Sequence, residues 1–367
     1  MGRGRRGGAS AARLFAVFAA AFVAVHPPLK LWLPWAAESA LASILGRPLG
    51  LREHNWHPLA AAPVPQTAVP TIDAAELAAG ATVDLTRPLL VTGAVTNAAF
   101  ELFSVDALQR PPLGDVVIDY FVDATKPGRL IPDGRARLGD IMRNITLGEP
   151  HKIGSQHVVS RNGCCPDRDK RASTLEALLP RPLARALGGA GRFSTTALDL
   201  SLLTVPLFVA GAPIGARPRT DLHSEPIASV AVQLRGAKTW TLVPAAASAV
   251  LRPRPSPDGR AYFRSSLHEE SELDRVEGRY EVTTRAGDML YVPPWTWHAV
   301  SYDSTDVSIA ASLFHFVPSS FIKNQPAFAV AILPNLVKEL LGVNTQQSEW
   351  CFTNGVVYRK LLGVPST

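Results

Sequence analysis

The sequence predicts a mainly β fold with flanking helices, an α+β chain built around a jelly roll, or double-stranded β-helix. Three observations predict this fold. Apolar residues alternate with polar ones in several short runs between residues 220 and 313. Turn residues separate these runs, and no helical pattern lies between the central ones. After Phe316 the apolar spacing changes to that of a helix. A jelly roll followed by helices fits all three observations.

The central strands are expected in a definite order. Residues 220–243 alternate around a turn at 235–237, which is the pattern of a β-hairpin. A strand at 289–292 ends at a Pro-Pro corner, and a further strand covers 298–302. The last strand continues the alternation over 307–313.

Four segments follow from changes in composition. Residues 1–37 are predicted to be a signal peptide or signal anchor. Residues 38–80 are rich in Ala and Pro and are predicted to be a linker. Residues 81–318 are predicted to form the folded domain. Residues 319–367 are predicted to be a helical appendage that either packs on the domain or forms a homodimer contact.

The N-terminal segment has the pattern of a targeting signal. Arginines precede the apolar run Leu14–Val25, which is the order found in secretory signals. As a helix this run would extend only about 18 Å, too short to cross a bilayer alone. We therefore predict the secretory pathway, either its lumen or a membrane-anchored state. An organellar transit peptide is the alternative, because the segment is rich in Arg and Ala and free of acids.

The charge of the remaining chain excludes some partners. The 367 residues are 47% hydrophobic and 19% charged, which is typical of a folded protein. The net charge is +6, but residues 1–37 contain five basic residues and no acid. The remainder holds 32 basic and 31 acidic residues. We therefore expect neither a nucleic-acid partner nor a surface suited to histones.

Two minor features bear on the compartment. A sequon that begins at Asn144 predicts N-glycosylation if the protein is secreted. The only cysteines are Cys164, Cys165 and Cys351, which lack the spacing of a zinc site. Either Cys351 pairs with one of the adjacent two in an oxidising compartment, or all three are ordinary thiols.

Two histidines and a glutamate are placed to hold one metal ion. His223 and Glu225 are two residues apart, so on a strand their side chains project from one face. With His298 they make the two-histidine, one-carboxylate triad that suits Fe(II) and leaves coordination positions open. By chance such a chain contains about 0.8 pairs of this spacing, so the surrounding residues must supply specificity. The alternatives are a surface pair at 223 and 225, a core histidine at 298, and His315 as a rival ligand.

A lysine and a threonine nearby predict an anion in the same site. Lys238 is expected on one apolar face, where an unpaired ammonium is costly; the residues in register with it are Val230, Val232, Leu234, Trp240 and Leu242. Lys238 therefore needs an anionic partner. The hydroxyl of Thr220 could join Lys238 in holding a carboxylate. A lysine that snorkels from the sheet edge is the alternative.

At these residues the sequence resembles the Jumonji-C and cupin-like family of Fe(II)- and 2-oxoglutarate-dependent hydroxylases, which includes the asparaginyl hydroxylase of hypoxia signalling. The resemblance is carried by TDLHSE at 220–225, QLRGAKTWTLVP at 233–244 and GDMLYVPPWTWHAV at 287–300. Weaker likeness extends upstream, so that residues 83–318 are covered. The chain departs from the pattern with Ser229 in place of an asparagine and Leu313 in place of a polar residue.

The resemblance implies a cupin-like jelly roll in which His223, Glu225 and His298 bind Fe(II). It implies that Thr220 and Lys238 bind the distal carboxylate of 2-oxoglutarate. The implied reaction hydroxylates a protein or peptide side chain, or a small molecule, as 2-oxoglutarate is decarboxylated to succinate and carbon dioxide. No catalytic residue beyond the metal ligands is implied. Residues 245–280 are where a substrate-facing loop would lie.

Three other functions are compatible with the scaffold. A catalytically silent jelly-roll binding module would have no use for the five residues of the site. A JmjC-type lysine demethylase fits neither the N-terminal segment nor the nearly neutral body. A metal-dependent cupin isomerase or dioxygenase that does not use 2-oxoglutarate would leave Lys238 unexplained.

Overall fold

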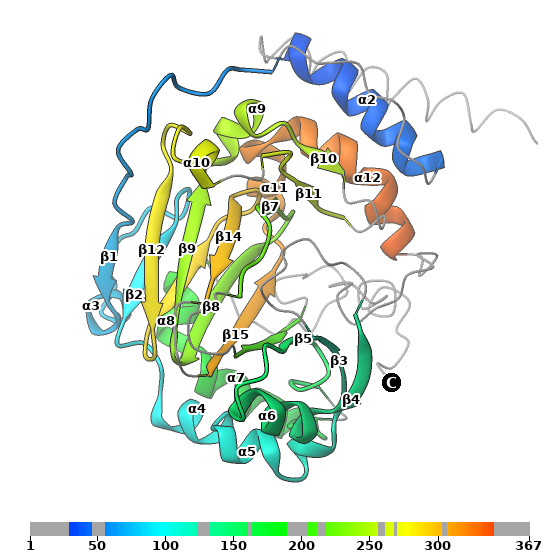
Figure 1. The fold of residues 1–367 in the computed structure, drawn as a ribbon. Helices are drawn as coiled ribbons and strands as arrows, with labels where there is room; N and C mark the ends of the chain where they lie inside the picture. Colours follow the sequence, from blue (N-terminus) through cyan, green and yellow to red (C-terminus); the bar gives the residue numbers. More distant parts are fainter. Residues whose placement is uncertain are drawn as a thin grey trace, which may run out of the picture.

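Two β-sheets form the centre of the molecule, with helices gathered at opposite ends (Figure 1). The structure is a computed structural model and describes residues 29–45, 56–122, 132–160, 163–188, 204–211, 218–255, 261–267, 270–302 and 307–340. The predicted mainly β fold with flanking helices is confirmed, and the pair of sheets is consistent with a jelly roll.

The larger sheet has nine strands. In spatial order they are β1 (Thr71–Asp73), β2 (Leu89–Thr92), β13 (Met289–Val292), β8 (Ala228–Arg235), β15 (Ser308–His315), β6 (Leu207–Ala210), β5 (Lys152–Ser155), β3 (Val117–Phe121) and β4 (Gly134–Arg137). All neighbours are antiparallel except β1 and β2. Both sides of the central strand β8 are largely buried because both faces of the sheet are covered.

The smaller sheet has six strands and carries the candidate site. In spatial order they are β10 (Arg254–Pro255), β11 (Phe263–Arg264), β7 (His223–Ser224), β14 (Trp297–Ser301), β9 (Ala237–Val243) and β12 (Tyr280–Arg285). All of these pairs are antiparallel. The two short strands β10 and β11 come from the segment 245–280 that we expected to be a substrate-facing loop.

The hairpin predicted at residues 220–243 is wrong, although both of its strands exist. β8 pairs with β13 and β15, whereas β9 pairs with β12 and β14. Gly236, with φ of +66°, turns the chain from one sheet into the other. Alternation along a sequence shows which side chains share a face, but it does not show which strand is the neighbour.

Each sheet has an inner face toward the other sheet and an outer face. The space between the sheets, called here the barrel interior, is lined by apolar residues such as Ala231, Leu242 and Leu290. The outer face of the larger sheet is covered by a larger core that includes Val230 and Val232. Consecutive side chains of β8 point to opposite faces of the sheet. One face borders the barrel interior and the other borders the larger core.

Helices cover the outer face of the larger sheet and one end of the barrel. The first group comprises α3 (Ala74–Ala78), α4 (Asn97–Leu102), α5 (Val105–Gln109), η1 (Leu113–Asp115), α6 (Leu138–Thr146), α7 (Arg168–Leu178) and α8 (Arg181–Ala186). Thr96, Ser104 and Asp167 cap α4, α5 and α7 by accepting a backbone N–H bond. The second group comprises η2 (Ala245–Ala247), α9 (Ser248–Leu251), α10 (Glu270–Leu273), α11 (Pro318–Asn324) and α12 (Pro326–Leu340).

The N-terminal helix α2 (Leu29–Leu45) packs against α12 at this second end (Figure 1). Trp35 is fully buried, and its ring lies 5.3 Å from Phe263 and 5.4 Å from Phe328, between ring centroids. Its indole N–H donates to the carbonyl of Pro253 over 3.0 Å. The helix is therefore part of the aromatic core beside β11.

Two of the predicted segment boundaries, after residues 37 and 80, do not coincide with the ends of the elements that the structure shows. The junction placed between residues 37 and 38 falls inside α2, whose buried tryptophans precede the junction. The segment expected to be a linker also contains β1 and α3, which belong to the larger sheet and its cover. Helices do follow residue 318, as the spacing predicted, while residues 341–367 lie outside the described part. No helix within the described ranges has both the length and the hydropathy needed to span a bilayer.

The cysteine expectations are corrected by the structure. Cys164 and Cys165 are joined to one another, so neither is available to Cys351, and they are not free thiols. Both are buried in the larger core, and their sulfur atoms lie near the hydroxyl of Thr174. Cys351 lies outside the described residues.

Candidate metal centre

The pairing of β7 with β14 brings the two predicted histidines together. His223 and His298 are directly opposite one another, and their ring centroids are 4.1 Å apart. Glu225 follows β7 directly and completes the group. One ligand atom from each of the three residues lies within 4.8 Å of the other two. This is the one such group of three within the described part of the chain, and each member is half-buried.

The hydrogen bonds of the two imidazoles leave the same nitrogen open on each. The Nδ1 atom of His223 lies 2.8 Å from the carbonyl oxygen of Asp221. That of His298 lies 3.1 Å from the carbonyl oxygen of Thr296. A carbonyl only accepts, so Nδ1 carries the proton in both rings and Nε2 keeps its lone pair. Metal-binding histidines commonly have this arrangement, because the bond fixes both tautomer and ring orientation.

The electrostatic surroundings keep His298 in the form that binds metal. Burial, followed by the neighbouring His223, lowers the pKa of His298 to about 3. A neutral imidazole is the ligand form, so the side chain needs no deprotonation at neutral pH. Two buried imidazoles this close would repel each other if both were protonated, whereas a cation between them would be stabilised by both.

An ion pair from β11 adjoins His223 and was not predicted from the sequence. Arg264 is opposite His223 in the ladder, and its guanidinium donates to the carboxylate of Asp221. Burial alone would raise the pKa of Asp221, but His223 and Arg264 outweigh it and lower that pKa. Tyr262 contacts the ring of His223 edge-on at 5.9 Å between centroids.

The residue after the Pro-Pro corner holds the loop that carries Glu225. Trp295 has a φ of +65°, which is unfavourable for a residue with a side chain. Its backbone N–H donates to the carbonyl of Glu225 over 2.8 Å, and its carbonyl accepts from the hydroxyl of Ser224 over 3.0 Å. Its ring N–H donates to the carbonyl of Phe321 over 2.7 Å. These bonds compensate for the backbone strain and fix the chain beside the glutamate.

Lys238 points into the barrel interior with Trp240 and Leu242, as its register predicted. The same register also included Val230, Val232 and Leu234, and that part is wrong: these three lie in the core on the outer face of the larger sheet, because the chain crosses from one sheet to the other at Gly236.

The side chain of Lys238 is 2% exposed, and its ammonium lies 5.0 Å from the ring of Tyr302 and 5.5 Å from that of Phe208. Burial lowers the pKa of Lys238 to about 7. Within the described residues no carboxylate forms an ion pair with it. A buried ammonium surrounded only by aromatic rings still lacks an anionic partner.

Thr220 lies beside the strand that carries His298. Its hydroxyl oxygen accepts the backbone N–H of Val300 over 2.9 Å, and its own N–H donates to the Val300 carbonyl. A hydroxyl can accept and donate at once, so this bond leaves the O–H proton available for a further acceptor.

Two positions on the last strand face away from the barrel interior. His315 and Leu313 alternate with Ser312, and Leu313 belongs to the core on the outer face of the larger sheet. His315 shares that face and lies 6.3 Å between ring centroids from Tyr291, so it does not join the three residues of the candidate metal site. Leu313 also faces away from the barrel interior, and its neighbour Ser312 is on the opposite face of β15.

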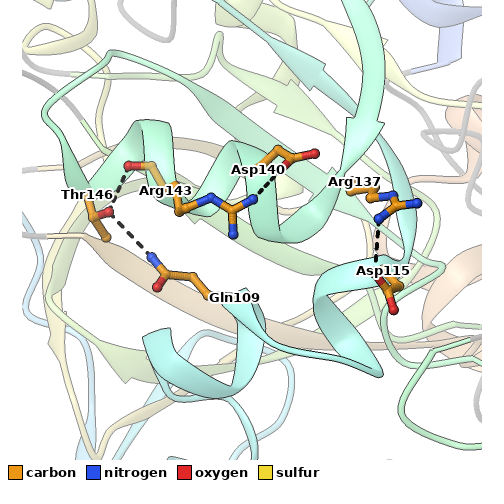
Figure 2. Close-up of polar contacts among 6 residues, drawn as sticks. All are labelled: Gln109, Asp115, Arg137, Asp140, Arg143 and Thr146. Atoms are coloured by element: carbon orange, nitrogen blue, oxygen red, sulfur yellow. Dashed lines mark hydrogen bonds and ion pairs between the residues drawn. The ribbon is translucent and has the colours of Figure 1, made fainter.

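The sequon at Asn144 is at the C-terminal end of α6 and not in a loop. The hydroxyl of Thr146 donates to the carbonyl of Arg143 over 2.7 Å and accepts from Gln109 over 3.4 Å (Figure 2). Asn144 itself is half-buried. Its glycosylation stays a prediction, and in this fold the acceptor lies in a helical turn.

A comparison with protein families places part of the chain in a known domain type. Residues 201–319 match the model of the cupin-like domain, and this range contains Thr220, His223, Glu225, Lys238 and His298. No curated protein matches the chain. The matched range and the two-sheet fold together support a cupin or JmjC family for this part of the protein.

Proposed function

We propose that the protein is an Fe(II)- and 2-oxoglutarate-dependent oxygenase that hydroxylates a protein or peptide side chain. One observation carries the proposal. The ligand atoms of His223, Glu225 and His298 converge, and the ammonium of Lys238, which forms no ion pair with any described residue, faces the same barrel interior. Metal binding alone does not require a buried lysine. A dicarboxylate co-substrate bound at the metal does require a cation for its second carboxylate.

The residues present fit Fe(II). Both imidazoles are held by backbone carbonyls in the tautomer that exposes Nε2, and a single carboxylate completes the set. A ferrous ion in this set would supply the redox chemistry that couples loss of carbon dioxide from 2-oxoglutarate to hydroxylation of a C–H bond. Zn²⁺ accepts the same donors, so the identity of the metal must be tested directly.

Lys238 has the role of orienting the co-substrate. A carboxylate placed against its ammonium would gain a charge-assisted hydrogen bond in a site from which water is largely excluded. The O–H of Thr220 supports the same carboxylate from β14's side of the barrel. Both contacts would fix one end of 2-oxoglutarate, so that its keto-acid end is directed toward the metal ligands.

Aromatic side chains keep the barrel interior dry around the lysine. Phe208, Trp240 and Tyr302 surround its ammonium, and the indole N–H of Trp240 is occupied by the hydroxyl of Thr284 over 3.1 Å. Exclusion of water strengthens the ion pair and protects reactive species from side reactions.

The substrate and compartment are proposed on indirect support. The strands β10 and β11 border the metal ligands on the side opposite β14, where a polypeptide could approach. The nearly neutral body does not favour nucleic acid. The basic and apolar N-terminal segment supports a location in the secretory pathway. Microscopy of the full chain in cells would distinguish this location from an organelle reached through a transit peptide.

Succinate formation tests the proposal. The full chain is incubated with Fe(II), 2-oxoglutarate and oxygen, and succinate is followed with and without candidate peptides. We expect succinate that requires the metal and is lost in His223→Ala. The matched control is His57→Ala, which removes an exposed histidine far along the chain from the site. If the wild type neither binds 2-oxoglutarate nor exceeds His223→Ala, the chain is a silent jelly-roll module. Formaldehyde released from methylated lysine peptides would instead identify a demethylase.

A further inference from the structure

The second end of the molecule exposes aliphatic side chains on helices that are already packed on one side. On α2, Trp32, Trp35 and Ala36 are buried against the aromatic core. On the opposite face, Leu33 is 50% exposed and Ile44 is 61% exposed. Leu33, Ala37, Leu41 and Ile44 follow at intervals of four, four and three residues, so they form one stripe along the helix.

These exposed residues are concentrated and not scattered. Six of the nine large hydrophobic residues exposed in the described part of the chain lie on three helices: Leu33, Leu41 and Ile44 of α2, Ile322 of α11, and Val330 and Leu333 of α12. Single exposed hydrophobics need no explanation, but a group on adjacent helices indicates a surface that is covered by something.

The composition of α2 strengthens this conclusion. Its 17 residues include only two charged ones, Lys30 and Glu38, and its apolar residues surround the helix. A surface helix normally shows a polar face to water. Here α12 covers one apolar face, and the other apolar face has no cover among the described residues.

The nature of the exposed side chains favours lipid over a second protein. The stripe contains Leu, Ile and Ala, while the tryptophans of α2 are turned inward. Protein interfaces are enriched in exposed aromatic residues and arginine at their centres, and leucine and valine are under-represented among the residues that dominate binding. Aliphatic residues without charges are instead suited to the boundary between head groups and acyl chains.

The sequence before α2 points to the same partner. The apolar run Leu14–Val25 ends three residues before the helix begins at Leu29. Four residue steps reach at most about 14 Å, so any surface that received this run would have to lie close to α2. Arginines at positions 3, 5, 6 and 13 precede the run, and basic residues beside an apolar segment favour anionic head groups.

We propose that the exposed faces of α2 and α12 rest on the surface of a lipid bilayer. The aliphatic stripe enters the head-group boundary, and the preceding apolar run and arginines hold it there. The opposite face of α2 packs on Phe263, next to Arg264 in β11, so the wall beside His223 is turned toward the lipid. This surface is separate from the metal ligands, and its test does not depend on enzyme activity.

Photo-crosslinking identifies what covers α2. A benzophenone amino acid replaces Leu41 in the full chain, which is then irradiated with vesicles of phosphatidylcholine and phosphatidylserine in equal amounts. The matched position is Leu147, which is 81% exposed at the end of α6, far from α2 (Figure 1). We expect a lipid adduct at position 41 and none at 147. An adduct between two protein chains would assign the surface to a homodimer, and the absence of any adduct at 41 would also overturn the proposal.

Charge substitution gives an independent measurement on the same surface. The double variant Leu33→Asp with Leu41→Asp should lower the vesicle partition coefficient of the full chain about tenfold, because each carboxylate must leave the boundary region. Leu147→Asp should leave partition unchanged. The proposal requires both this difference and the lipid adduct. Equal partition of the two variants would overturn it, and circular dichroism spectra that match the wild type in both would show that the proteins are folded.

Discussion

The inner face of the smaller sheet carries a half-buried histidine, and the outer face of the larger sheet carries a buried one with nearly the same local geometry. His298 on β14 and His315 on β15 both direct Nδ1 to the carbonyl two residues earlier, at 3.1 and 3.4 Å. Burial lowers the pKa of both, to about 3 and about 4. The difference lies across the sheet: His298 faces His223, whereas His315 faces Tyr291 and an apolar core.

This comparison shows what identifies a site in this fold. A strongly lowered histidine pKa reports burial, and burial occurs on both faces of a covered sheet. A metal site also requires other donors at a common point, and among the described residues only the barrel interior supplies them. The alternation of side chains along one strand therefore decides between a ligand and a core residue.

The largest effect is expected from removal of a ligand on the inner face. His298→Ala should weaken binding of Fe(II) or Co²⁺ by at least about a hundredfold, because changes in groups that only orient ligands already cost tenfold to a hundredfold. Anaerobic calorimetric titration of the full chain measures this. The fold should persist by circular dichroism, since the removed side chain is half-buried. Metal affinity within threefold of wild type would exclude His298 as a ligand.

Loss of the buried ammonium should affect the co-substrate and not the metal. Lys238→Met keeps the length of the side chain and removes its charge, so 2-oxoglutarate affinity should fall roughly tenfold to a hundredfold, the worth of a hydrogen bond to a charged group. Lys238→Arg keeps the charge and should retain part of the affinity. Titration with 2-oxoglutarate at fixed metal measures both variants. An unchanged dissociation constant in Lys238→Met would remove the lysine from the site.

The same lysine should make stability depend on pH. Its pKa is about 7 in the folded protein against 10.5 when exposed, so between these values the unfolded chain binds more protons. The free energy of unfolding should therefore rise with pH from 7 to 10, by up to about 1.4 kcal/mol per unit. Urea unfolding at several pH values, compared with Lys238→Met, isolates this contribution. A slope identical in the two proteins would show that the ammonium is not desolvated.

A smaller effect is expected from the ion pair behind His223. Arg264→Ala leaves Asp221 without its guanidinium partner, and the carbonyl of Asp221 holds the Nδ1 proton of His223. Metal affinity should fall about tenfold, as for other groups that orient a ligand. Arg264→Lys should recover part of it, and the thermal midpoint should change less than the affinity. A loss of stability with unchanged metal affinity would limit the pair to a structural role.

The sequence predicted the residues of the site better than the course of the chain. His223 and Glu225 could be assigned to one face because a strand has a period of two, which needs no knowledge of neighbours. The neighbouring strands of β8 and β9 could not be predicted. A one-residue turn at Gly236 has the same sequence pattern whether the chain folds back on itself or crosses to the other sheet.

The parts that sequence patterns missed depend on contacts between distant segments. Arg264 has no local signal of its role, since its position opposite His223 arises from pairing of β11 with β7. Trp35 lies in a segment that reads as a targeting signal, and only its packing against Phe263 and Phe328 places it in the core. Composition identifies apolar segments but does not show which surface receives them.

The smallest effect is expected at His315 on the outer face, and its substitution tests directly whether His298 and His315 lie in separate environments. The Nε2 atom of His315 is buried without a hydrogen-bond partner, which costs free energy in the folded protein. His315→Leu replaces it with an apolar side chain of similar size, so the free energy of unfolding should be unchanged or higher by about 1 kcal/mol. Metal affinity should not change, because this side chain lies on the face away from the barrel interior. A loss of metal binding without a loss of stability would mean that His315 reaches the site and that the two faces are not separate environments.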